Sequence, residues 1–167
     1  MRGILLAAVL VAVAGAAAAH VTASPDQGKA GSYFVTSFTV PHGCAGAATV
    51  AVRIKLPDGV QDVKPQMKPG WTVEVVRRKL AEALHDSHGN TITEAVDEVD
   101  WRGGPLPDSL YETFGLLMKL PDRAGATLYF PTVQECQSGV HRWIEIPAAG
   151  QQWHDLQEPA PFVKLTP

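Results

Sequence analysis

The chain has 167 residues, with 14 lysines and arginines against 17 aspartates and glutamates, and a formal net charge of −3 at neutral pH. This mild acidity, with no block of basic residues, argues against nucleic acid and anionic membranes as partners. The length allows one domain with a sizeable core, and no linker or internal repeat divides the chain.

The first nineteen residues have the pattern of a cleaved secretion signal. Arg2 precedes an apolar run over residues 4–13, and small residues follow where a signal peptidase cuts. The run is too short for a membrane span, which takes about 20 apolar residues. We predict cleavage after Ala19, and the spacing also permits a cut one or three residues earlier. The mature domain, residues 20–167, is then expected in the periplasm or another extracytoplasmic space.

The segments after the leader alternate apolar and polar residues with period two, between Pro and Gly turns, which predicts an all-β protein. The expected strands cover residues 34–40, 50–56, 71–75, 92–101, 112–120, 128–133 and 140–146. Residues 77–84 are the one helix-like candidate, and we assign them to strand and loop. Residues 85–90 resemble a hairpin loop. Seven or more short strands favour a sandwich of two antiparallel sheets, as in immunoglobulin-like domains.

Cys44 and Cys136 are the only cysteines. In an oxidising exported setting they are interpreted first as a disulfide, which contributes about 4 kcal/mol to stability on the chain-entropy model. A metal site built from their thiolates is the alternative.

His20 becomes the first residue of the mature protein if the predicted cleavage occurs. Its freed α-amino nitrogen and its ring Nδ1 can then chelate one metal ion in a six-membered ring, which suits the square nitrogen and oxygen geometry that Cu(II) favours. A disordered, solvated terminus is the ordinary alternative. The other histidines of loops and turns lack a supporting ligand pattern and are expected to be structural or solvated: His42, His85, His88 and His154.

Seven segments of the mature chain are informative when they are taken in order. They are His20-Val-Thr, Val40-Pro-His-Gly-Cys44, Lys64-Pro-Gln-Met-Lys-Pro-Gly-Trp71, Thr91-Ile-Thr-Glu-Ala95, Gly104-Pro-Leu-Pro-Asp108, Leu128-Tyr-Phe-Pro131 and Arg142-Trp-Ile-Glu-Ile-Pro147. Together they resemble the YcnI family of exported copper-binding domains, over essentially the whole mature chain. The resemblance implies a cupredoxin-like β-sandwich that binds Cu(II) through a single-histidine brace. In that brace the ligands are the terminal amine, the ring of the same histidine and a glutamate, with a tryptophan close to the metal.

Carried over residue by residue, the resemblance assigns the brace histidine to His20 and the tryptophan to Trp143. We expect Trp143 either to be half exposed beside the metal or to be an ordinary packed side chain. The glutamate is displaced, because the family often has Tyr-x-Glu-Phe where this chain has Tyr111-Glu112-Thr113-Phe114. A shift by one residue turns a strand side chain to the opposite face. Two alternatives follow. Either Glu112 is the ligand, through a local bulge or a different alignment, or another residue supplies the carboxylate.

Glu112 also has a physical argument of its own. It shares a strand face with Phe114, where a carboxylate is costly to bury without a partner, and a metal ion is one such partner. We therefore predict Glu112 as the metal ligand. An ion pair with Arg or Lys at the rim of the sheet is the alternative, and Glu145 on the last strand is the other acid to test.

The resemblance implies a protein that binds copper and passes or stores it without turnover. Its expected partners are the copper ion and other periplasmic or membrane copper-transport proteins. One alternative is a copper oxygenase acting on polysaccharide, which needs a second histidine such as His42 or His141 and has no motif to support either. Another is a structural or sugar-binding sandwich in which His20 is incidental.

Overall fold

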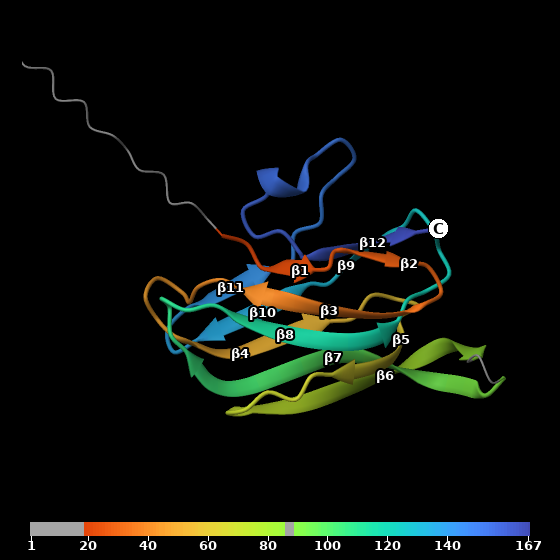
Figure 1. Cartoon of the computed structure of the whole chain (residues 1–167), viewed down its shortest axis with the longest axis horizontal. Helices are drawn as coiled ribbons and strands as arrows, with labels where there is room; N and C mark the ends of the chain where they lie inside the picture. The colour runs from red at the N-terminus through yellow and green to blue at the C-terminus, as the bar shows by residue number, and fades with distance from the viewer. Residues whose placement is uncertain (1–18, 86–88) are drawn as a thin grey trace, which may run out of the picture.

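The computed structural model of the chain describes residues 19–85 and 89–167, which form a β-sandwich (Figure 1). Residues 1–18 of the predicted leader and residues 86–88 of the predicted hairpin loop lie outside the described residues. The strands are β1 (Thr22–Ser24), β2 (Gln27–Lys29), β3 (Tyr33–Val40), β4 (Thr49–Lys55), β5 (Gln61–Pro65), β6 (Trp71–His85), β7 (Thr91–Leu106), β8 (Glu112–Lys119), β9 (Thr127–Tyr129), β10 (Thr132–Cys136), β11 (Val140–Trp143) and β12 (Phe162–Thr166). In these ranges the only helical segment is the 3-10 turn η1 (Trp153–Asp155), and no helix is long or apolar enough to cross a membrane.

Two main sheets form the layers of the sandwich. One has the strand order β1-β3-β8-β5 and the other β11-β10-β4-β7-β6. The strands within both pair antiparallel. A small third sheet, β2-β12-β9, contains a parallel pair between β2 and β12. The prediction of an all-β, antiparallel sandwich is confirmed, with β1 and β11 as edge strands of the two layers.

Large apolar side chains from both layers meet in the core. In the first sheet Phe38 of β3 pairs with Phe114 of β8, and both side chains are fully buried. The facing sheet contributes Ile54 of β4 and Trp101 of β7, also fully buried. The Trp101 and Phe114 rings meet edge-on with 5.5 Å between their centroids. Burial of side chains of this size stabilises the fold by roughly 1.5–3 kcal/mol each, which is why the period-two pattern predicts the strands.

The predicted disulfide between Cys44 and Cys136 is present. It ties the loop after β3 to the end of β10, and so links the two layers across 92 residues of sequence. Both cysteines are consumed in this bond, which excludes the alternative of a thiolate metal site.

The predicted strand over residues 128–133 is wrong as a single element, because β9 and β10 belong to different sheets. The chain crosses between sheets at Phe130 and Pro131. The Phe130 N–H donates to the carbonyl of Pro161, beside β12, whereas the carbonyl of Pro131 accepts from the N–H of Lys55 in β4. Alternation alone does not reveal this crossing, because both halves bury apolar side chains.

Two other predicted strands have different limits in the structure. The strand expected over residues 140–146 ends at Trp143, and Glu145 forms an isolated bridge with Pro159 instead. Residues 71–75 and 77–84 form one continuous strand, β6, which confirms that no helix forms there. This strand pairs with β7 as far as His85 and Thr91, as a hairpin requires.

Candidate metal centre

His20 is packed against the sandwich immediately before β1 begins. The next residue, Val21, is completely buried, and β1 pairs with β3. The His20 ring makes edge-on contacts with Trp143 at 5.9 Å and with Trp153 at 5.2 Å between ring centroids. The ring is therefore held between two aromatic side chains rather than lying free in solvent.

Trp143 is a buried anchor of this region, and the expectation of a half-exposed side chain is wrong. Only 2% of its surface is exposed. The indole Nε1–H donates to the side-chain oxygen of Gln134 at 3.0 Å. The amide nitrogen of Gln134 donates in turn to the carbonyl of His42 at 2.6 Å and to the Thr49 hydroxyl at 2.8 Å. This network fixes the position of the tryptophan against which His20 packs.

Two further histidines lie at the same tryptophan. The ring centroids of His42 and His141 are 6.2 Å and 5.0 Å from that of Trp143, and the two histidine rings are 5.6 Å apart. His141 alternates with Trp143 along β11, so the sequence could have suggested that pair. His42 comes from the loop after β3, in the other sheet, and the one sequence signal for its approach is the predicted disulfide between Cys44 and Cys136.

The acid next to this histidine cluster is Glu158, which the sequence did not indicate. It belongs to the segment between β11 and β12 that carries η1 and lies over the β1 and β11 edges (Figure 1). One carboxylate oxygen is 2.7 Å from His141 Nδ1, and the other accepts the N–H of Arg142 at 2.9 Å. The carboxylate of Glu145 accepts the N–H of Glu158 at 2.8 Å and so helps to position it. Glu158 and His20 line one open recess at the surface.

Glu112 is the first residue of β8, opposite Val40 of β3, and it has protein partners. Its carboxylate is 2.8 Å from Lys68 Nζ and accepts the N–H of Thr113 at 2.8 Å. Burial acts to raise the pKa of the Glu112 carboxyl, but the hydrogen bonds from Lys68 and Thr113, with the Lys68 charge, hold that pKa below its ordinary value. This is the ion pair named above as the alternative, and ligation by Glu112 stays a prediction.

The sheet order explains why Glu112 and His20 are separated. β8 lies two strands from β1, with β3 between them. Neighbouring strands are about 4.8 Å apart, so the two backbones differ by about 10 Å in position. To ligate one ion, the two side chains would have to reach across this separation, and the Glu112 carboxylate already has Lys68 as its partner.

In residues 19–85 and 89–167 no group of three or more His, Cys, Asp or Glu side chains is arranged to hold a metal ion. In this chain, however, the backbone nitrogen of His20 is still in a peptide bond to Ala19. The structure brings the rings of His20 and Trp143 into contact, as the resemblance implies. The terminal amine that would complete the chelate requires the predicted cleavage after Ala19.

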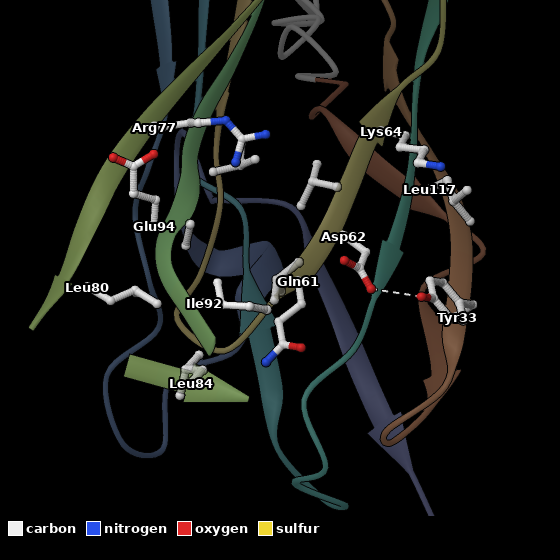
Figure 2. Close-up of a pocket in the computed structure, with 14 residues that line it drawn as sticks. Tyr33, Gln61, Asp62, Lys64, Arg77, Leu80, Leu84, Ile92, Glu94 and Leu117 are labelled. Atoms are coloured by element: carbon white, nitrogen blue, oxygen red, sulfur yellow. Dashed lines mark hydrogen bonds between the residues drawn. The ribbon is translucent and has the colours of Figure 1, made fainter. Parts of the chain in front are cut away.

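A second cavity, of about 570 Å³, lies on the opposite edges of the sheets, between β5 and the β6–β7 hairpin. Its walls combine the aliphatic side chains of Leu80, Leu84 and Ile92 with Arg77 and Glu94 (Figure 2). Among the described residues, those that line this cavity include no histidine or cysteine.

A family model described as a domain of unknown function, DUF1775, matches residues 20–165. Among solved structures, the chain is similar to an uncharacterized protein from Nocardia farcinica whose crystal structure reveals an immunoglobulin-like fold. The two share 29% sequence identity with a TM-score of 0.67, over 89% of this chain and 99% of that one. No curated protein matches the chain.

Proposed function

We propose that this chain, which belongs to the DUF1775 family, is an exported protein that binds one Cu(II) ion through the histidine at its mature amino terminus. The observation that carries the proposal is the packing of the His20 ring between Trp143 and Trp153. A disordered, solvated terminus, which is the ordinary alternative, would not be held in this way. The resemblance to the YcnI family supports the same residue pair.

The chemistry of the proposed site follows from the freed terminus. An amine and the Nδ1 of the same residue chelate one ion at little conformational cost, because the protein already holds the imidazole. Two nitrogen donors in one plane suit the square coordination of Cu(II) better than the octahedral oxygen sets of Mg²⁺ or Ca²⁺. Trp143 and Trp153 supply an apolar wall that fixes the ring and limits access of water from that side.

A carboxylate completes the proposed ligand set, and Glu158 and Glu112 are the candidates. Glu158 lines the recess that contains His20, whereas Glu112 is paired with Lys68 on β8. A carboxylate adds a hard oxygen donor and offsets part of the charge of the ion. We therefore propose Glu158 as the ligand and keep Glu112, the acid predicted from the sequence, as the alternative.

The proposed role is to hold copper outside the cytoplasm and to exchange it with other periplasmic or membrane copper-transport proteins, without turnover. The recess beside His20 is open, so a bound ion would stay accessible to the ligands of a partner. A copper oxygenase acting on polysaccharide is the second candidate, and one observation favours it: His42 and His141 lie at the same tryptophan as His20. Formation of oxidised sugar products by the copper-loaded protein with a reductant would favour the oxygenase, and we expect none.

Copper retention by the mature protein tests the proposal. Residues 20–167, prepared with a free terminus, are loaded with Cu(II), dialysed and analysed for metal. We expect one retained ion per chain, and loss of that ion in His20→Ala. His154→Ala is the matched control, because His154 lines the same recess with a side chain that is 74% exposed. A structural or sugar-binding sandwich predicts no retained copper in the unmodified protein, and that result would overturn the proposal.

A further inference from the structure

His42 makes two short contacts that a single neutral ring cannot both satisfy. Its Nε2 is 2.9 Å from the carbonyl oxygen of Ala19, and its Nδ1 is 2.6 Å from the carbonyl oxygen of Gly43. Both partners are acceptors, whereas neutral imidazole carries one N–H donor. A neutral ring can therefore donate to only one of the two carbonyls.

The Ala19 carbonyl belongs to the peptide bond at which the leader is predicted to be cut. After that cut the oxygen leaves with the leader, and the conflict disappears. The Nδ1–H can then donate to Gly43, and the lone pair of Nε2 has no protein partner. Histidines that bind metals through one ring nitrogen usually donate the other N–H to a carbonyl or a carboxylate, which fixes the ring and its tautomer.

The freed Nε2 also faces the new terminus. The carbonyl oxygen and the nitrogen of one peptide group are about 2.3 Å apart, so the 2.9 Å contact places His42 Nε2 within about 5 Å of the His20 backbone nitrogen. Two nitrogens that bind one ion are at most about 4 Å apart, because each metal–nitrogen bond is about 2 Å. A movement of about 1 Å by the freed chain end closes the difference.

We propose that His42 is a second imidazole ligand of the copper ion, made available by removal of the leader. The inference rests on the proposed function and adds a third nitrogen donor to its site. It also makes copper loading a property of the mature chain: in the precursor the scissile carbonyl occupies His42 Nε2, and the His20 nitrogen is an amide.

His141 provides the matched comparison. Its ring also contacts Trp143, and its Nδ1 is bound to the Glu158 carboxylate. Its contacts within the described residues do not include Ala19 or His20. Replacement of His141 therefore perturbs the same aromatic cluster without removing the nitrogen that faces the terminus.

Pulsed electron paramagnetic resonance of the mature protein with one equivalent of Cu(II) counts the coordinated imidazoles. We expect two in the unmodified protein, one in His42→Ala and two in His141→Ala. Competition with a chelator should show Cu(II) binding about tenfold or more weaker in His42→Ala, since loss of even an indirect partner of a metal ligand costs 10–100-fold. Near-UV circular dichroism and an unchanged disulfide establish that each variant is folded.

The outcomes separate the two claims. A single imidazole in the unmodified protein overturns the role of His42 and leaves the proposed function intact. A signal that loses one imidazole in His141→Ala, and not in His42→Ala, also overturns it. Failure of the unmodified mature protein to bind Cu(II) overturns the proposed function itself, and the inference with it.

Discussion

Gln134 connects the buried tryptophan to the loop that carries His42, so its replacement tests whether this network holds the candidate site together. The side chain is completely buried and makes hydrogen bonds with Trp143, His42 and Thr49. In Gln134→Leu the volume is nearly kept, but the Trp143 Nε1–H loses its acceptor. A buried donor left without an acceptor costs about 1–3 kcal/mol, and each of the other two hydrogen bonds contributes about 0.5–1.5 kcal/mol.

Burial of the leucine offsets part of this loss, and we expect the variant to be about 3 kcal/mol less stable. Urea denaturation of the mature protein with its disulfide intact measures the difference. Gln151→Leu is the control, because Gln151 is exposed and accepts one hydrogen bond from the N–H of Ala148; it should change stability by less than about 0.5 kcal/mol. Copper affinity should also fall in Gln134→Leu alone, since the His42 loop loses its anchor. A loss of less than about 1 kcal/mol, with unchanged affinity, would refute the reasoning.

Three other measurements address separate parts of the molecule. Thiol titration of the unfolded, unreduced protein should find no reactive thiol, and reduction should cost about 2–5 kcal/mol of stability; two reactive thiols would contradict the bond between Cys44 and Cys136. Glu158→Gln should weaken Cu(II) binding more than Glu112→Gln, and the reverse order would return the ligand to Glu112. The lowered pKa of Glu112 means that its pair with Lys68 stabilises the fold above the unfolded-state value of 4.5 and that this contribution is lost as pH falls through the lower folded-state pKa. Glu112→Gln should therefore reduce the change in the free energy of unfolding between neutral pH and the folded-state pKa of Glu112. The reduction should be less than about 1 kcal/mol, because the pair is partly exposed. An unchanged pH dependence of stability would count against the pair.

The strands that the sequence predicts well are those with one buried and one exposed face. In β3 the burial alternates residue by residue, as the period-two pattern requires, and in β8 it does so from Leu116 to Lys119. The limits of β9 and β10 could not be predicted in this way, because the crossing at Pro131 interrupts no apolar pattern. The disulfide could be predicted because the sequence contains no other cysteine that could bond to Cys44 or Cys136.

The sequence predicted only some residues of the candidate site. His20 and Trp143 were proposed from the leader and from the family resemblance, and the structure brings their rings into contact. The sequence left open whether Trp143 is half exposed or packed, and the structure shows that it is buried. The position of His42 beside Trp143 depends on which edge strands of the two sheets face each other. The position of Glu158 beside His141 depends on the path of the chain after η1. Sheet order and loop return are long-range properties, which local alternation does not encode.

The measurement that tests the central claim most directly is Cu(II) binding by two mature proteins that differ by one residue. One begins at His20, and the other carries a single glycine before it, which converts the α-amino group of His20 into an amide and moves the free amine away from the ring. The account predicts that the first binds one Cu(II) with an electron paramagnetic resonance spectrum of nitrogen-rich square coordination, and that the second binds far more weakly with a different spectrum. Equal affinity and identical spectra would contradict a copper site built on the terminal histidine.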